Sequence, residues 1–138
     1  DREAVIDGVA DGTLEIISSD HAPHCDYEKE VEFANASFGI TGLENELAVS
    51  LMQLYHSGRM KLSDLIERLT IAPARLIKLD RGTLSIGAVA DVTVFDPDAE
   101  WIFNREETVS KAFNNPFYGW KLKGRNFMTI VAGEIAWQ

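Results

Sequence analysis

Apolar residues recur at helical spacing along much of the first half of the chain. Residues 2–10 place alanine and valine on one helical face, and Asp11-Gly12 gives a stop signal, so a helix is predicted there. A second apolar stripe predicts an amphipathic helix that is closed by Ser57-Gly58. The members of this stripe are Leu43, Leu47, Leu51 and Leu54.

Two shorter helices are predicted next along the chain. The first runs through residues 63–69, with Ser63 as its N-cap, because a serine oxygen can accept a hydrogen bond from an unpaired N–H of the first turn. The second runs through residues 73–78, with Pro73 in its first turn, where the missing N–H of proline costs little.

A β-rich segment and an irregular segment interrupt the helical pattern. Residues 13–18 read TLEIIS and predict a short buried strand. Residues 19–41 lose all periodicity and contain His, Pro, Asn, Ser and Gly, so they predict a long loop. Loops of this length inside a compact domain are usually functional.

The pattern changes to alternation after Asp80. Residues 82–103 carry β-branched residues between turn residues, and residues 96–98 (Asp-Pro-Asp) predict a turn. Residues 120–137 predict two further strands, joined near residues 132–134. The expected fold class is therefore α/β, with a helical first part and a small β-region after it.

Composition and charge narrow the range of partners. The chain has 138 residues, a normal length for one domain, and its net charge is −9, from 22 acidic and 13 basic residues. This sign argues against binding to nucleic acid or to an anionic membrane. A single cysteine excludes an internal disulfide and suits a reducing compartment, and no apolar run approaches the ~20 residues of a membrane helix. No signal peptide is recognised, so a cytoplasmic location is predicted.

The candidate chemistry lies in residues 19–24, which read SDHAPH directly after the predicted strand. Asp20 can bind a divalent metal through oxygen or accept a proton from water. His24, four residues on and past a proline, can bind a metal or donate a hydrogen bond to an anion. From these residues alone, a metal or catalytic site and a capped turn with a surface histidine both stay open.

Five segments carry a resemblance to one family. The motif SSDHAPH resembles the strand-8 motif of dihydroorotases, members of the amidohydrolase superfamily. The other four segments are similar to that family in the same order along the chain: DREAVIDGVADGTLEIIS, FGITGLENEL, GTLSIGAVADVTVFDP and NNPFYGWKLKGRNFMTIVAGEIAW.

The resemblance implies a (β/α)8 metal-dependent hydrolase barrel with a small β-sandwich. Residues 1–80 are expected to supply the C-terminal part of the barrel, its last strand and helices with the strand-8 catalytic loop. Residues 81–138 are expected to supply the C-terminal strands of the sandwich. Such barrels need about 250 residues. An N-terminal segment of the same enzyme is therefore an expected partner, and the chain by itself is expected to be inactive.

The same resemblance implies a zinc cofactor of one or two ions and gives four residues a role. Asp20 matches a metal-ligating aspartate that is also the catalytic base. His24 matches the contact to the substrate carboxylate. Phe38 and Gly39 match positions where backbone groups touch the substrate ring, because glycine permits close approach. The competing interpretations are a cap for Asp20, a solvated loop histidine for His24, and a simple turn with Phe38 in the core.

The remaining metal ligands are expected upstream of this chain. The family uses a His-x-His pair, a carboxylated lysine and two further histidines, whereas this sequence has 3 histidines and no His-x-His. Of the others, His21 is interpreted as a supporting group and His56 as a surface residue. Cys25 is not expected to be a nucleophile, because no base and orienting group accompany it.

The implied reaction is the reversible hydrolysis of the cyclic amide of dihydroorotate to N-carbamoyl-aspartate, a step of pyrimidine biosynthesis. One alternative is another cyclic amidohydrolase, such as a hydantoinase, dihydropyrimidinase or allantoinase. His24 favours dihydroorotase over these, because their substrates lack the carboxylate. The other alternative is a non-catalytic dihydroorotase-like partner of aspartate transcarbamoylase. A homo-oligomer and a complex with aspartate transcarbamoylase are both compatible with the resemblance.

Overall fold

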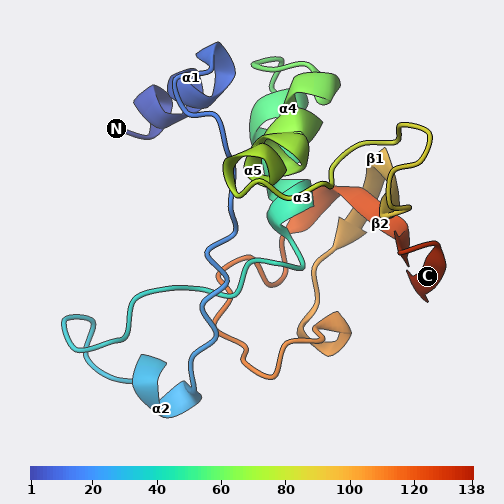
Figure 1. The fold of residues 1–138 in the computed structure, drawn as a ribbon. Helices are drawn as coiled ribbons and strands as arrows, with labels where there is room; N and C mark the ends of the chain where they lie inside the picture. The colour runs from blue at the N-terminus through green and yellow to red at the C-terminus, as the bar shows by residue number, and fades with distance from the viewer.

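The computed structural model describes all 138 residues. Helices occupy the first half, and an antiparallel sheet of three strands in the order β1-β2-β3 occupies the second (Figure 1). The chain is therefore α/β, as predicted. The elements are α1 (Arg2–Asp11), α2 (Asp26–Lys29), α3 (Glu46–Ser50), η1 (Leu51–Tyr55), α4 (Leu62–Leu69), α5 (Ile71–Leu76), β1 (Val92–Ile102), η2 (Arg105–Glu107), β2 (Lys121–Val131) and β3 (Glu134–Trp137). None of the helices combines the length and apolar character needed to cross a bilayer.

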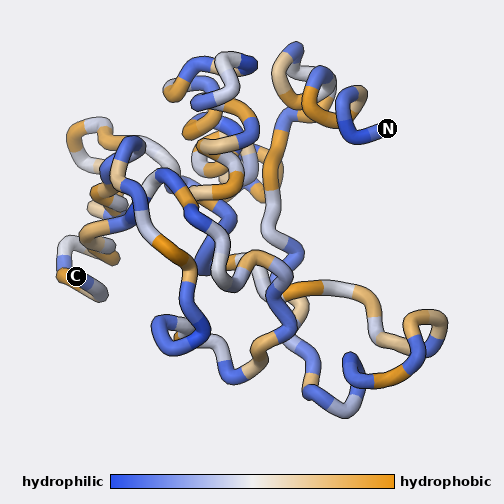
Figure 2. The backbone as a smooth tube through the Cα atoms, turned by 180° about the vertical axis from the view of Figure 1, so that it is seen from behind, coloured by the Kyte–Doolittle hydropathy of each residue, from blue (hydrophilic) through white to orange (hydrophobic).

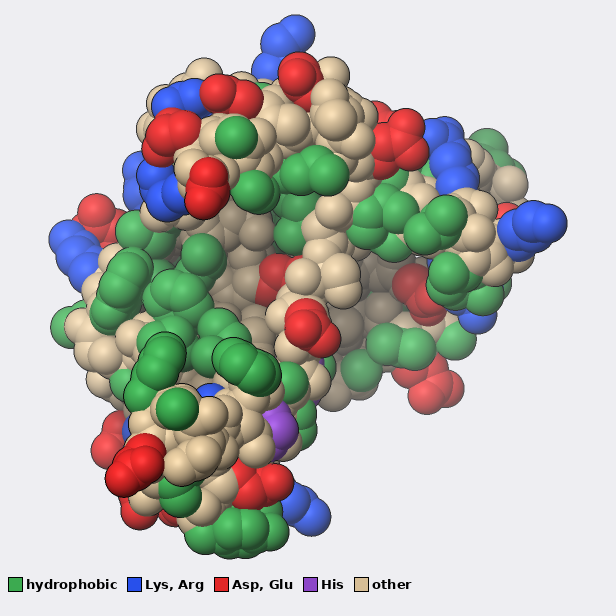
Figure 3. Space-filling model, turned by 90° about the vertical axis from the view of Figure 1, so that its left-hand side faces the viewer, with side chains coloured by type: hydrophobic (Ala, Val, Ile, Leu, Met, Phe, Trp, Pro, Cys, Tyr) green, Lys and Arg blue, Asp and Glu red, His purple; other side chains and the backbone are tan.

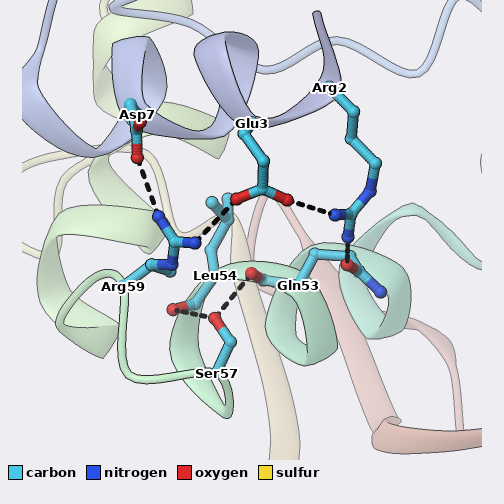
Figure 4. A network of polar contacts seen from close by, with 7 residues as sticks. All are labelled: Arg2, Glu3, Asp7, Gln53, Leu54, Ser57 and Arg59. Atoms are coloured by element: carbon cyan, nitrogen blue, oxygen red, sulfur yellow. Dashed lines mark hydrogen bonds and ion pairs between the residues drawn. The ribbon is translucent and has the colours of Figure 1, made fainter.

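Helix α1 confirms the first predicted helix and its stop signal. It ends at Gly12, whose φ of 92° is the left-handed conformation that ends many helices. Polar contacts fix α1 to η1 and to Arg59, which follows it (Figure 4). The guanidinium of Arg59 donates to Asp7 at 2.8 Å and to Glu3 at 2.7 Å, and Arg2 donates to Gln53.

The leucine stripe forms the centre of the helical part. Leu51 and Leu54 are buried with Val9, Met60 and Leu65 in one hydrophobic cluster. The predicted helix nevertheless begins later than Leu43, which is mostly exposed, because the chain first turns through the Asn45 N–H to Gly42 carbonyl hydrogen bond. The second half of this helix, η1, is a π-helix.

The predicted cap of α4 is wrong. The helix begins at Leu62, so Lys61 takes the N-cap position and the Ser63 hydroxyl donates to Asp64 at 2.9 Å. Leu65 of this helix is fully buried in the cluster with Leu51. Pro73 lies in the first turn of α5, as predicted.

The predicted strand at residues 13–18 does not form. A strand needs a neighbour to satisfy its backbone groups, and no strand of this chain lies beside it. Its backbone makes one long-range bond, from the Ile17 N–H to the Arg68 carbonyl at 3.1 Å. The only bridge nearby is a parallel one between His21 and Ile40.

Residues 19–41 form the long loop that was predicted, with the one-turn helix α2 inside it. The loop projects to the end of the molecule opposite α1 and α4 (Figure 1). Apolar stretches continue along it (Figure 2), and its aromatic side chains Tyr27, Phe33 and Phe38 are exposed. The segment between β1 and β2 runs to the same end and contacts the loop.

The sheet confirms two of the predicted strands and their connection. Strands β2 and β3 pair antiparallel and are joined by Ala132 and Gly133, whose φ values are 51° and 88°. Positive φ at both central residues is the geometry of a two-residue hairpin turn. Residues 82–91, by contrast, contain no strand, so the β-region begins only at Val92.

The predicted turn at residues 96–98 is wrong as a chain reversal. Strand β1 continues through it, and the pairing with β2 is interrupted between Asp96 and Glu100. The Asp98 N–H donates to the Asp96 carboxylate at 2.8 Å, which closes the irregularity locally. The Asp-Pro-Asp sequence therefore produces a bulge in a strand.

A second cluster joins the helices to the sheet. It buries Ala48 of α3 together with Phe103, which follows β1, and Leu122 of β2. Gly124 permits the close approach of β2, because a Cβ there would lie 2.3 Å from Leu51 Cδ1. Only 14 of the 138 residues are buried, and a band of hydrophobic side chains runs over one face toward the loop end (Figure 3). Much apolar surface is thus uncovered in this chain.

Candidate active site

Three segments that are distant in sequence meet at the loop end of the molecule. They are residues 20–24, residues 37–42 and residues 113–115. The Ala22 N–H donates to the Ile40 carbonyl at 2.8 Å, next to the parallel bridge of His21 with Ile40. The predicted strand-end motif and the predicted substrate loop therefore lie side by side.

His24 is half-buried, and both of its ring nitrogens face other residues of the loop. Its Nε2 lies 2.7 Å from the Phe38 carbonyl oxygen, and its Nδ1 lies 3.7 Å from a carboxylate oxygen of Glu28. Because a carbonyl only accepts, Nε2 carries a proton and donates this bond. The interpretation of His24 as a freely solvated loop histidine does not fit these contacts.

Gly39 adopts a backbone conformation that only glycine adopts easily. Its φ is 111°, and a Cβ there would lie 2.5 Å from the Ala22 Cβ and 3.5 Å from His24 Nε2. A larger residue would therefore separate the two segments. The structure brings His24, Phe38 and Gly39 together.

Phe38 contributes its backbone to this arrangement and not its ring. Its carbonyl faces His24, whereas its side chain is 95% exposed. The interpretation of Phe38 as a core residue is therefore wrong within this chain. The loop projects outward from the helices and the sheet (Figure 1), and the ring of Phe38 stays exposed on it.

Asp20 stands apart from the other predicted site residues. Its side chain is exposed and accepts no hydrogen bond from another residue of the chain, so it is not a helix or turn cap. Its φ of 44° lies in the left-handed region, which Asp tolerates better than most residues. The carboxylate is therefore free to bind a ligand from outside the chain.

His21 supports the site through the backbone that follows the substrate loop. Its Nδ1 accepts hydrogen bonds from the Gly42 N–H at 3.1 Å and the Leu43 N–H at 3.4 Å. This agrees with its interpretation as a supporting group. His56 is not the surface residue that was expected: it is half-buried and lies 2.8 Å from the Pro97 carbonyl, which ties η1 to β1.

One acidic residue beside the site has a shifted pKa. Burial raises the pKa of Glu46 above its ordinary value of 4.5. Glu46 lines a small cavity of about 180 Å³ together with Ser19, Ile40 and Gly42. The Glu46 carboxyl group therefore lies close to the backbone of both loops, the one that contains Ser19 and the one that contains Ile40 and Gly42.

The chain alone does not form a metal centre. No group of three or more His, Cys, Asp or Glu side chains is arranged to hold an ion. Asp20 fits one position in a ligand set, because its carboxylate is exposed and unpaired.

Two residues that sequence reasoning missed hold the site together. Lys29 donates to the Ser37 carbonyl at 2.7 Å and to the Gly39 carbonyl at 3.1 Å. Asn114 accepts from the His24 N–H at 3.1 Å and donates to the Ala22 carbonyl at 2.9 Å. The only local signal was the Asn-Asn-Pro run at residues 114–116, which reads as a turn.

The sequence of this chain is similar to those of known proteins along its whole length. The dihydroorotase of Citrifermentans bemidjiense is 48% identical over 138 residues, which are 100% of this chain and 32% of that protein. The dihydroorotase of Aquifex aeolicus is 47% identical over 139 residues, again 100% of this chain and 32% of that protein. The chain thus spans 32% of the length of these curated relatives.

Solved structures give the same fold. Dihydropyrimidinase from Brevibacillus agri matches with a TM-score of 0.91 at 21% identity, over 99% of this chain and 31% of that one. L-Hydantoinase (dihydropyrimidinase) from Arthrobacter aurescens matches with a TM-score of 0.88 at 28% identity, over 97% of this chain and 31% of that one. The sequence model of the amidohydrolase family matches residues 1–136. The chain therefore belongs to the amidohydrolase family.

Proposed function

We propose that this chain is the C-terminal part of a dihydroorotase, which hydrolyses the ring amide of dihydroorotate reversibly to N-carbamoyl-aspartate. The observation that carries the proposal is identity of 43% to 49% to dihydroorotases across the chain. The solved hydantoinases and dihydropyrimidinases share the fold at 21% to 28% identity. The lower identity to these enzymes supports dihydroorotate as the substrate.

In this proposal residues 1–80 complete a (β/α)8 barrel and residues 81–138 complete a small β-sandwich. Two observations support the division. Residues 13–18 are β-rich but unpaired, as expected of a strand whose neighbours belong to another segment. Large apolar side chains such as Leu76, Leu84 and Ile86 are exposed, although soluble proteins rarely leave wide apolar patches uncovered. The missing neighbour is the N-terminal segment of the same enzyme.

Asp20 is proposed as a zinc ligand and as the catalytic base. A bound zinc ion supplies Lewis-acid polarisation of the amide carbonyl and lowers the pKa of water toward about 7. The free carboxylate of Asp20 suits the acceptance of a proton from the attacking water. Asp20 then returns the proton to the ring nitrogen as the amide bond breaks, so no net proton is left on the protein.

His24 and the Phe38–Gly39 backbone are proposed to bind the substrate. The Nε2–H of His24 now donates to a neutral carbonyl. In the complex it exchanges this bond for one to the substrate carboxylate, which is stronger because the acceptor is charged. Gly39 permits the substrate ring to lie against the backbone, because no side chain stands there.

The test uses the full-length enzyme that contains this chain. Turnover of dihydroorotate, hydantoin and allantoin should be compared, with Asp20→Asn and His24→Ala as variants. Dihydroorotate should be the preferred substrate, Asp20→Asn should remove nearly all turnover, and His24→Ala should mainly weaken binding. Preference for hydantoin would assign the chain to the hydantoinases, which the fold likeness also allows. An enzyme without zinc or turnover would instead match a non-catalytic partner of aspartate transcarbamoylase.

A further inference from the structure

We propose that Asn114 is a positioning residue, which sets the spacing between the His24 loop and the Gly39 loop. The inference rests on the proposed function, because it takes these two loops to be the substrate-binding loops. Asn114 lies 90 residues beyond His24 in sequence and reaches the site from the segment between β1 and β2. It is half-buried and does not line any of the larger cavities.

Every hydrogen-bonding group of the Asn114 side chain is used across the two loops. Its Oδ1 accepts from the His24 N–H at 3.1 Å. Its Nδ2 donates to the Ala22 carbonyl at 2.9 Å and to the Gly39 carbonyl at 3.3 Å. One planar amide therefore fixes the backbone of His24 and the backbone of Gly39 relative to each other.

The backbone of Asn114 is itself fixed by a buried network. Its carbonyl accepts from the Thr41 N–H at 3.2 Å. The neighbouring Asn115 side chain donates to the Thr41 carbonyl at 2.8 Å and accepts from Asn45 at 3.1 Å. Asn115, Thr41 and Asn45 are all buried, and a satisfied buried network of this kind is rigid.

This anchoring makes Asn114 a fixed reference for the site. His24 Nε2 reaches the Phe38 carbonyl at 2.7 Å only if the two loops keep their spacing. The loops cannot move closer to each other at Gly39, because Gly39 already lies against Ala22. A displacement of about 1 Å at such a site can lower the rate about 100-fold. Asn114 therefore acts on the reaction through His24 and Gly39, without touching substrate.

The first test is the kinetics of variants of the full-length enzyme. Asn114→Ala should lower kcat/KM for dihydroorotate by about 10- to 100-fold. Asn114→Asp keeps the size and the acceptor for His24 but loses both donors, so it should lose a similar factor. The matched control is Asn35→Ala, in the exposed part of the loop that carries His24 and Gly39, which should keep wild-type kinetics. Wild-type kinetics in Asn114→Asp would mean that Asn114 only fills space, and would overturn the proposal.

A double-mutant cycle separates positioning from a general loss of stability. Because Asn114 acts in part through His24, Asn114→Ala should lower kcat/KM by a clearly smaller factor in the His24→Ala background than in the wild-type enzyme. Multiplication of the two single losses would overturn the proposal, because independent sites combine additively in free energy.

Amide hydrogen exchange tests the contact without any activity. The His24 N–H should exchange at least about fivefold faster in Asn114→Ala than in wild type, and unchanged in Asn35→Ala. Equal exchange in all three proteins would overturn the role of Asn114. If the wild-type enzyme does not hydrolyse dihydroorotate, the proposed function fails, and this exchange measurement still decides the role of Asn114.

Discussion

Replacement of Gly39 by alanine perturbs the candidate site at its tightest point. The new Cβ meets two costs that can be estimated separately. The φ of 111° is unfavourable for a residue with a Cβ, at about 1–2 kcal/mol. The Cβ would also lie 2.5 Å from the Ala22 Cβ, far inside ordinary contact. Overpacking of this kind costs about 1–3 kcal/mol.

The free energy of unfolding of Gly39→Ala should therefore fall by about 2–5 kcal/mol. Because relief of the contact moves the Ala22 backbone away from Gly39, the kcat/KM for dihydroorotate should fall about 100-fold. Urea denaturation and steady-state kinetics of the full-length enzyme measure the two effects.

Two further variants isolate the cause. Gly58→Ala also places alanine at positive φ, 74°, but no atom lies within 4 Å of its Cβ, so it should lose only about 1–2 kcal/mol and no activity. Adding Ala22→Gly to Gly39→Ala removes the Ala22 Cβ, with which the new Cβ would clash. The double variant should therefore regain the part of the free energy of unfolding that overpacking had removed. Equal losses for Gly39→Ala and Gly58→Ala, or no recovery in the double variant, would refute the reasoning.

Three other predictions concern the proposed base, the docking of α1 and a buried carboxyl group. Asp20→Asn should keep the circular dichroism spectrum of the wild type but lose nearly all turnover; near-normal turnover would exclude it as the base. Arg59→Ala removes the contacts to Glu3 and Asp7 (Figure 4), so the free energy of unfolding should fall by about 1 kcal/mol, and by less in high salt; Arg75→Ala, which breaks one exposed pair, is the control. Burial raises the pKa of Glu46 in the folded protein. The contribution of the Glu46 carboxyl group to the free energy of unfolding is therefore fully present below its ordinary pKa of 4.5, and it is lost as pH rises through the raised pKa. In Glu46→Gln the free energy of unfolding, measured by urea denaturation at several pH values, should no longer fall over this range. The same pH dependence in the variant and the wild type would contradict the role of Glu46.

Local signals in the sequence predicted the elements that depend on neighbouring residues. Helix α1 with its Gly12 stop follows from periodicity and left-handed glycine, and the hairpin at residues 132–134 follows from its turn residues. The buried leucines of η1 follow from the stripe. These features need only a few adjacent residues, so the pattern was sufficient.

The predictions that failed depend on contacts with distant segments. Residues 13–18 have strand composition but no neighbouring strand in this chain to bond with. Ser63 is not the cap, because α4 already begins at Leu62 and Lys61 takes the N-cap position. Residues 96–98 have turn residues, yet the chain does not reverse there, because its pairing with β2 resumes at Glu100.

The candidate site shows the same limit. The resemblance gave His24, Phe38 and Gly39 roles in substrate binding, and the structure brings the three residues close to one another. Asn114 was missed because its partners lie up to 92 residues away, and an Asn-Asn-Pro run carries no information on what it contacts. Side chains that join distant loops can be found only when the fold has brought those loops together.

The most direct test of the proposal is the specificity of the full-length enzyme with and without the His24 side chain. We expect dihydroorotate to be hydrolysed with a higher kcat/KM than hydantoin, and His24→Ala to lose most of that preference, because its imidazole is the proposed donor to the substrate carboxylate. A wild-type enzyme that prefers hydantoin, or a His24→Ala variant with unchanged preference, would contradict the assignment of this chain to a dihydroorotase.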